Sequence, residues 1–372
     1  MVSPLVALGV AFAAPVQAQD DAAGFDDRLW SSNPAAAPEQ PAGQAGASQG
    51  GEISLVADAP SGAEEEEEGA PWRGSQVTYL NEIGVVSFDR SFDLTYNPYW
   101  LMTWVFRPRW WFDDVWNVAA RLDISREATQ ADDRTYSGET WVHDLLLSAG
   151  ASNFYTIPGA GIDLSADLVL TVPTSKISQA RTLALGIGPG VRIGREFDLG
   201  PAGTLSLGYR VRFSAFLHRF TTGELETPII PSCSGIDGGC DEFINTGERN
   251  TQWRVQHGVS IAWQPLEWLG VSTGFEHIVS WLYDIEADDP RLSNQAEADI
   301  DARYSSAFDV ELTFVPWEPF EIGVGYATLS PQLAPDSTYY NPFYNRYSTV
   351  FVDIRLMVDG LINQFMGEGS EG

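Results

Sequence analysis

Residues 100–127 read WLMTWVFRPRWWFDDVWNVAARLDISRE and contain five Trp and four Arg. Even positions hold mostly aromatic or aliphatic side chains, whereas odd positions hold most of the polar ones, including Arg107 and Arg121. Successive side chains of a β-strand point to opposite faces, so the stretch predicts a hairpin with one apolar and one polar face. A three-residue turn at 112–114 keeps both polar sets on the same face.

The same alternation returns at 162–172, 205–217, 308–314 and 350–356. Segments of about ten residues suit a tilted strand that crosses a bilayer. We predict twelve strands, which start near residues 78, 99, 115, 141, 161, 181, 203, 252, 268, 304, 319 and 347. Turns after the even strands are short and most connections after the later odd strands are long. The predicted fold is therefore all-β, a membrane-spanning antiparallel up-and-down barrel of about 12 strands whose short turns face the periplasm.

A soluble β-sandwich also alternates and is the alternative fold. Aromatic residues near the strand ends favour the barrel, because rings with one apolar and one wet side suit the two membrane interfaces. The predicted aromatic girdle consists of Trp100, Trp110, Trp111, Trp116, Trp141, Trp253, Trp263, Trp268, Trp281 and Trp317.

In this pattern residues 77–358 resemble Gram-negative outer-membrane β-barrels of the porin and transporter kind. The resemblance implies export to the bacterial outer membrane, contact with membrane lipid and lipopolysaccharide, and insertion by the outer-membrane assembly machinery. Such barrels usually end in a strand with a terminal aromatic residue. Here the last strand is followed by GLINQFMGEGSEG at 360–372, so the assembly signal departs from that pattern.

The two ends of the chain differ in composition from the barrel segment. Residues 1–18 form an apolar run ending in Val-Gln-Ala and are predicted to be a signal peptide. Residues 19–76 are predicted to be a disordered, acidic, Pro/Ala/Gly-rich periplasmic segment, because low hydrophobicity and like charge prevent a packed core. Residues 359–372 are assigned to a C-terminal tail. The formal net charge of −30 makes nucleic acid an unsuitable partner.

Two cysteines, Cys233 and Cys240, lie in a Gly-rich loop and are expected to form a disulfide in an oxidising compartment. No histidine lies near them, so we predict no zinc site and no cofactor. The acidic stretches EADDP and DGGCDE in the outer loops are the expected place for divalent cations that bridge to lipopolysaccharide.

The polar face of the strands carries the candidate functional residues. The predicted lumen-lining set consists of Arg107, Arg109, Arg121, Asp123, Asp163, Asp167, Arg192, Arg210, Arg212, Arg254, Asp309, Glu311, Asp353 and Arg355. These charges either form a cationic arc that faces an anionic one, or form Arg–carboxylate pairs that hold the wall together. Glycines on the same face, including Gly190 and Gly323, predict some open space in the lumen.

The function predicted from these features is passive passage of small polar solutes through the barrel. One alternative is a non-transporting barrel that binds a partner or surface through its long outer loops. A further alternative is an outer-membrane hydrolase, which needs a His close to both an acid and a Ser. No enzyme is predicted, because His143 and His277 each neighbour an acid that points to the opposite strand face. His257 and His277 fall unexpectedly on the apolar face.

Overall fold

The computed structural model describes residues 70–89, 91, 100–129, 138–226, 243–284, 301–317, 319–334 and 338–367. The predicted signal peptide, almost all of the predicted acidic segment and the Cys233–Cys240 pair lie outside these residues. The two acidic loop stretches considered for divalent cations lie outside them as well.

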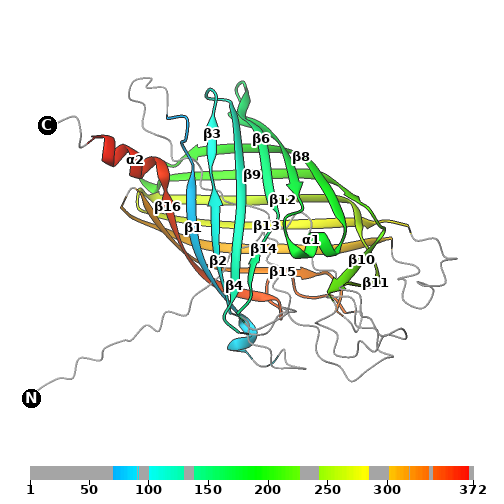
Figure 1. The fold of residues 1–372 in the computed structure, drawn as a ribbon. Helices are drawn as coiled ribbons and strands as arrows, with labels where there is room; N and C mark the ends of the chain where they lie inside the picture. Colours follow the sequence, from blue (N-terminus) through cyan, green and yellow to red (C-terminus); the bar gives the residue numbers. More distant parts are fainter. Residues whose placement is uncertain are drawn as a thin grey trace, which may run out of the picture.

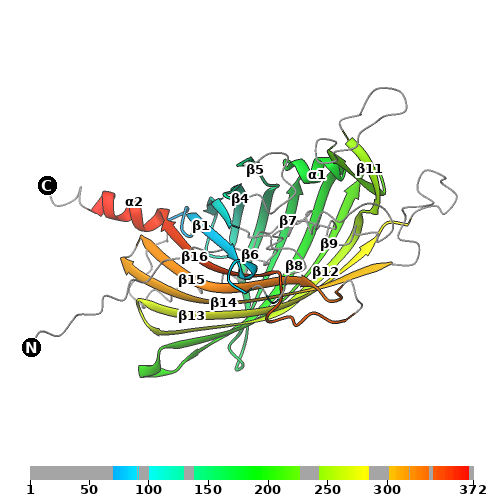
Figure 2. The ribbon, with the colours of Figure 1, turned by 90° about the horizontal axis from the view of Figure 1, so that it is seen from below.

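The described part of the chain forms a closed antiparallel β-barrel (Figures 1 and 2). The wall is built, in chain order, from β1 (Gln76–Gly84), β2 (Trp100–Arg107) with β3 (Arg109–Trp111), β4 (Trp116–Glu127), β5 (Thr140–Val142) with β6 (Leu145–Ile157), β7 (Ile162–Val172), β8 (Leu183–Asp198), β9 (Thr204–His218), β12 (Thr251–Leu266), β13 (Leu269–Leu282), β14 (Ala302–Trp317), β15 (Phe320–Pro331) and β16 (Ser348–Met357). The ring closes because β1 pairs with both β2 and β16.

The predicted up-and-down barrel of twelve strands is confirmed. β2 and β3 share one wall position because both pair with β4, and β5 and β6 share another for the same reason. Short turns join β3 to β4, β6 to β7, β8 to β9, β12 to β13 and β14 to β15 at one end, the short-turn rim. The longer connections meet at the other end, the long-loop rim.

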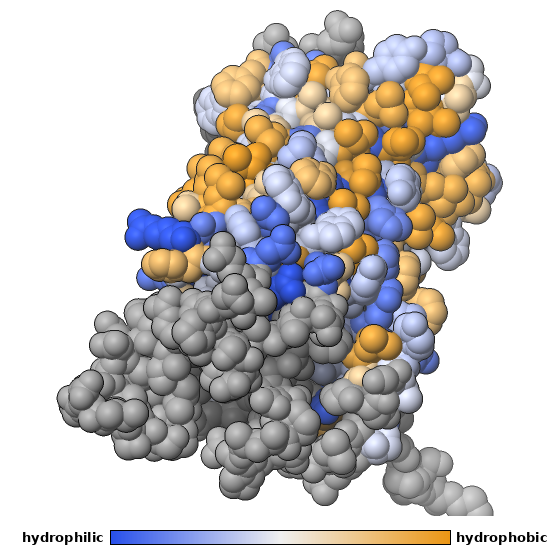
Figure 3. Space-filling view, turned by 90° about the vertical axis from the view of Figure 1, so that its right-hand side faces the viewer, coloured by the Kyte–Doolittle hydropathy of each residue, from blue (hydrophilic) through white to orange (hydrophobic). Residues whose placement is uncertain are grey.

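The outside of the barrel is apolar, which excludes the soluble sandwich. Exposed aliphatic side chains from different strands, such as Leu168, Val191, Leu207, Val259 and Ile261, share the outward face. A sandwich would bury such a face between two sheets, whereas this sheet closes on itself. Figure 3 shows apolar residues over much of the upper part of one side of the molecule. The chain thus has the architecture of an outer-membrane β-barrel.

Three elements go beyond the predicted strands. The connection between β9 and β12 carries a hairpin of β10 (Thr222–Glu226) and β11 (Phe243–Arg249). A short helix, α1 (Lys176–Ala180), lies between β7 and β8 (Figure 1). A second helix, α2 (Val358–Gly367), follows β16 and covers the first part of the predicted C-terminal tail. In the described residues no helix has the length and apolar character needed to cross a membrane.

Candidate functional site: the charged barrel interior and the short-turn rim

All fourteen predicted lumen residues lie on the face opposite the exposed apolar side chains. The strand register shows this directly, since Asp167 pairs with Gly190 and Gly190 with Arg212, while Glu321 pairs with Arg355. The fourteen differ in accessibility. Six are buried, namely Arg107, Arg121, Asp123, Arg254, Asp353 and Arg355. Arg192 is exposed, and the other seven, Arg109, Asp163, Asp167, Arg210, Arg212, Asp309 and Glu311, are half-buried.

The largest charged cluster surrounds Arg355. Its guanidinium lies 2.5 Å from Glu311 Oε1, 2.9 Å from Asp353 Oδ1 and 3.6 Å from Glu321 Oε2. Glu311 reaches Arg355 from β14 across the intervening strand β15. Gly323 of β15 permits this, because a Cβ atom there would lie 2.6 Å from Asp353 Oδ2 and 2.7 Å from Glu311 Oε1. Three carboxylates thus converge on one arginine inside the wall.

A similar arrangement recurs on the β7–β9 wall. Arg212 of β9 pairs with Asp167 of β7 across Gly190 of β8, where a Cβ atom would lie 2.7 Å from Asp167 Oδ1. On β4, Arg121 and Asp123 form a buried pair at 2.8 Å. Gly323 and Gly190 thus make room for the Arg355 cluster and for the Arg212–Asp167 ion pair rather than for open lumen. At least seven of the predicted lumen residues therefore take part in ion pairs within the described part of the chain, in agreement with the second of the two sequence-based alternatives.

Small side chains create space elsewhere in the interior. One row of paired residues crosses six strands and reads Asp163, Gly194, Gly208, Ser260, Gly274 and Asp309. The next row toward the long-loop rim contains Arg192 and Arg210, which pair directly across β8 and β9. Because Arg192 is exposed, this part of the interior is open to solvent.

The interior near the long-loop rim is packed more closely. Inward side chains such as Arg254, Phe216 and Ile278 are almost fully buried there. Ser125 and His143 also lie in this half, with Ser125 Oγ 2.7 Å from His143 Nε2. Ser125 is 1% exposed, so this pair does not face a substrate-accessible surface. In the described residues no group of three or more His, Cys, Asp or Glu side chains could hold a metal ion.

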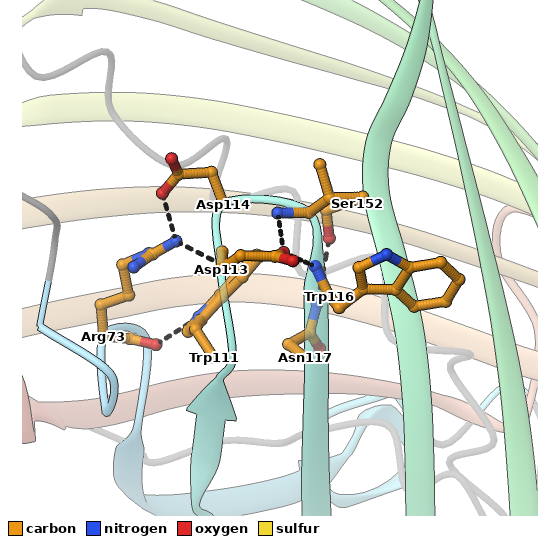
Figure 4. Close-up of polar contacts among 8 residues, drawn as sticks. Arg73, Trp111, Asp113, Asp114, Trp116, Asn117 and Ser152 are labelled. Atoms are coloured by element: carbon orange, nitrogen blue, oxygen red, sulfur yellow. Dashed lines mark hydrogen bonds and ion pairs between the residues drawn. The ribbon is translucent and has the colours of Figure 1, made fainter.

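At the short-turn rim, the segment 70–75 is fastened to the turn between β3 and β4 (Figure 4). Arg73 donates to the main-chain oxygen of Asp113 at 3.1 Å and pairs with Asp114 Oδ1 at 3.0 Å. Its guanidinium lies 4.4 Å from the ring centroid of Trp111, whose Nε1 donates to Arg73 O at 2.9 Å. We call these contacts the rim clamp.

Other contacts support the rim clamp from both sides. The Asp113 carboxylate accepts from the main-chain N–H groups of Trp116 and Val115, and these hydrogen bonds lower the pKa of Asp113. The main-chain N–H of Gly74 donates to Asp359 Oδ2 at 3.1 Å. The rim clamp thus joins the start of the described chain to the β3–β4 turn and to α2.

The girdle prediction is wrong for Trp111 and Trp141. Trp111 is 8% exposed and lies under Arg73 on the inward face, where its odd position places it with Arg107 and Arg109. Trp141 is 7% exposed and pairs with the buried Ser125, while Lys176 Nζ lies 5.9 Å from its ring centroid. The other eight tryptophans of the predicted girdle are exposed, namely Trp100, Trp110, Trp116, Trp253, Trp263, Trp268, Trp281 and Trp317.

Sequence reasoning missed several charged residues of the interior and rim. Glu321 and Arg303 occupy inward positions near strand ends. Each lies two residues from an inward position of the same strand, Gly323 and Ser305, and this spacing could have identified them. Glu82 and Glu276 are buried on the same face. Arg73 precedes the predicted start of the barrel and carries no periodic signal.

Comparison with known proteins finds similarity in fold alone. No protein-family model and no curated protein matches the sequence. Among solved structures, an outer membrane channel from Pseudomonas putida F1 has 9% identity and a TM-score of 0.45, covering 79% of this chain and 99% of that chain. The NanC porin has 9% identity and a TM-score of 0.38, covering 76% of this chain and 98% of its own. The KdgM porin, solved with disordered oligogalacturonate, has 8% identity and a TM-score of 0.37, covering 76% of this chain and 98% of its own.

The rim clamp makes a prediction for proteolysis. Trypsin cleaves after arginine, and the carbonyl of Arg73 is held by Trp111, so the Arg73–Gly74 bond should resist cleavage in the folded protein. Replacing Trp111 with alanine removes both the ring under the guanidinium and the Nε1 donor. We expect about ten-fold faster cleavage at Arg73, since roughly 1–2 kcal/mol of local stabilisation is lost.

Mass spectrometry of the tryptic fragments measures this rate. Trp110→Ala is the matched control, because Trp110 is exposed on the outward face and its ring centroid lies 6.5 Å from that of Trp72. Equal cleavage rates in the two variants would show that the rim clamp does not hold this segment.

Proposed function

We propose that this chain is an outer-membrane channel that passes small polar solutes through the interior of the barrel. The observation that carries the proposal is the row of Gly and Ser residues beside Arg192 and Arg210, enclosed by a closed wall with an apolar exterior. A polar, solvent-open interior within an apolar wall is the arrangement that a water-filled pore requires. The short-turn rim then faces the periplasm, and the long-loop rim faces outward.

Arg192 and Arg210 are the residues that we expect to influence passing ions. They pair across adjacent strands, and two neighbouring guanidinium groups attract anions and repel cations. The proposed selectivity element is therefore the Arg192–Arg210 pair.

Planar-bilayer recording tests the proposal. The purified chain should conduct, and the double variant Arg192→Glu/Arg210→Glu should shift the reversal potential in a salt gradient toward cation selectivity, by about three-fold or more in permeability ratio. Arg195→Glu is the control, because Arg195 is exposed on the same strand but on the outward face. Absence of conductance would overturn the channel. A conducting but unchanged double variant would overturn only the role of the arginine pair.

The buried ion pairs favour the second candidate, a non-transporting barrel. Arg121–Asp123 and the Arg355 cluster are excluded from water, and the interior near the long-loop rim is tightly packed. Such a barrel would act through its outer loops and should show no conductance in the same recording. The Ser125–His143 pair does not support the hydrolase alternative, because the pair is buried and a nucleophile must reach its substrate.

A further inference from the structure

The inward face of β9 changes from half-buried to buried along its length. Counted from the short-turn rim, Arg210 is half-buried, whereas Ser214 and Phe216 are buried. β12 repeats this change, because Ser260 is half-buried and Arg254, which pairs with Ser214, is buried. On these two strands the described interior is therefore accessible toward the short-turn rim and closed toward the long-loop rim.

The interior beside β1 is buried along most of the strand. Thr78, Leu80 and Glu82 are successive inward residues of β1, and each is almost fully buried. Across the interior, the ring centroid of Phe216 lies 5.2 Å from the guanidinium carbon of Arg254 and fills the space at its level. The solvent-accessible part of the described interior thus lies beside β8, β9 and β12 and ends at Phe216.

A group of hydrogen bonds lies beyond the buried end of β9, at the long-loop rim. The carbonyl oxygen of Arg181, between α1 and β8, accepts from His218 Nδ1 at 2.7 Å and from Asn250 Nδ2 at 2.9 Å. Asn250 Nδ2 also donates to Phe220 O at 3.0 Å. The segments before β8, after β9 and before β12 are thus tied together at one point. We call Arg181, Thr182, His218, Phe220 and Asn250 the Asn250 latch.

The Asn250 latch belongs to the inward side of the wall. His218 pairs with the buried Leu183 and follows Phe216 on the inward face of β9. Asn250 is fully buried. Gly223 of β10 packs closely there, since a Cβ atom would lie 3.5 Å from Asn250 Oδ1. α1 and β10 meet at this place (Figure 1). The latch therefore holds two connections, one with α1 and one with the β10–β11 hairpin, against the closed end of the interior.

Thr182 has a strained backbone within the Asn250 latch. Its φ is +58°, in the left-handed region that β-branched residues rarely adopt. Its carbonyl oxygen accepts from the main-chain N–H of Arg219 at 2.9 Å, and its Oγ1 accepts from that of Phe220 at 3.2 Å. Such strain persists only where the surrounding contacts impose it, and it is frequent in switch regions. Because release of these contacts lets Thr182 relax, the strain favours opening of the latch.

We propose that the Asn250 latch is a gate that closes the interior toward the long-loop rim, and that its release exposes Ser214 and Phe216. The side chain of Asn250 holds the gate shut through two hydrogen bonds, and the strain of Thr182 opposes it. The paired strands of the wall need not separate when the gate opens. As a control of solute passage the gate rests on the proposed channel, whereas as a closure of the interior it does not.

Thiol labelling of Ser214→Cys measures the gate directly. In isolated outer membranes a charged methanethiosulfonate should modify this position slowly, because Ser214 is 5% exposed. Adding Asn250→Ala removes both side-chain hydrogen bonds and should raise the rate about ten-fold. Adding Thr182→Asn instead should lower the rate, because asparagine tolerates the left-handed region and keeps an oxygen acceptor. Mass spectrometry of the fragment that contains position 214 separates this signal from the two native cysteines.

Asn345→Ala is the matched control for Asn250→Ala. Asn345 is also a buried asparagine near the long-loop rim, but its Nδ2 donates to Ser330 Oγ at 3.0 Å and to Asn341 O at 2.8 Å on the outward side of the wall. Its loss should leave position 214 protected. Equal labelling rates in the two alanine variants would overturn the gate. The heat-modifiable electrophoretic mobility of each variant reports its folding.

Planar-bilayer recording separates the gate from the proposed channel. If the chain conducts, Asn250→Ala should raise the fraction of time spent open and Thr182→Asn should lower it, each by about three-fold or more. Conductance that neither substitution alters would overturn the gate. Absence of conductance together with faster labelling in Asn250→Ala would overturn solute passage and support a gate over an interior cavity.

Discussion

Replacing Arg355 with methionine is expected to lower the free energy of unfolding by about 3–5 kcal/mol, the cost of leaving buried charges without their partner. Asp353 is 0% exposed, and Glu311 and Glu321 converge on the same guanidinium. Methionine keeps most of the side-chain volume, so the loss reports on charge rather than on a cavity. The unfolding midpoint in urea, followed by tryptophan fluorescence in lipid vesicles, measures the effect.

Two further variants supply a control and test whether the unpaired carboxylates cause the loss of stability. Arg195→Met changes an exposed outward arginine and should alter stability by less than about 0.5 kcal/mol. Adding Glu311→Gln and Asp353→Asn to Arg355→Met removes two of the three uncompensated charges and should restore a large part of the loss. An Arg355→Met barrel as stable as the Arg195→Met barrel would contradict the view that this cluster organises the β14–β16 wall.

Replacing Gly203 with alanine is expected to cost about 3 kcal/mol or more. Gly203 closes the turn between β8 and β9 with a φ of +83° and a ψ of −154°, a region that is essentially confined to glycine and costs other residues about 1–3 kcal/mol. A Cβ atom there would overlap the carbonyl oxygen of Gln264 and lie 2.7 Å from Cα of Pro265. Because both obstacles are backbone, the neighbouring turn between β12 and β13 must move.

Gly200 in the same turn supplies the control. Its φ is +60°, but a Cβ atom there meets nothing within 4 Å. Gly200→Ala should therefore cost only the conformational term of about 1–2 kcal/mol. The difference in urea midpoint between the two variants reports the contact between neighbouring turns together with the stricter backbone conformation of Gly203. If both substitutions cost the same, the turns do not pack as described.

The strand order could be predicted because each strand separates two environments. Trp100, Met102, Trp104 and Phe106 share one face, and that regularity sets both the strand and its orientation. The predicted strand starts near 99, 115, 161 and 203 lie within a residue of those observed at Trp100, Trp116, Ile162 and Thr204. A closed wall leaves no free edge, so the pattern alone leads to a barrel.

Residue type is a weaker guide than position for the tryptophans. Tryptophan favours membrane interfaces, but the odd position of Trp111 places it inward beside Arg109. Trp141 belongs to the short strand β5, and the break before β6 at Leu145 shifts the alternation. Neither the register across that break nor the helix α2 has a signal in the two-residue period.

The pairing of charges could not be predicted from the alternation of inward and outward positions. The alternation identifies Glu311 and Arg355 as inward residues, but it does not show that they meet across β15. That contact depends on the register of three strands and on the missing side chain of Gly323. The rim clamp is similar, because Arg73 lies outside every periodic segment and is held by contacts 38 to 41 residues away.

The joining of β1 to β16, and the hydrogen bond from Gly74 to Asp359 across 285 positions, constrain how the molecule is made. The ring cannot be completed until the last strand reaches the first, so during assembly β1 has one edge unpaired. During that interval the exposed edge can pair with another chain. Assembly should thus depend on a factor that shields the edge of β1 until β16 arrives.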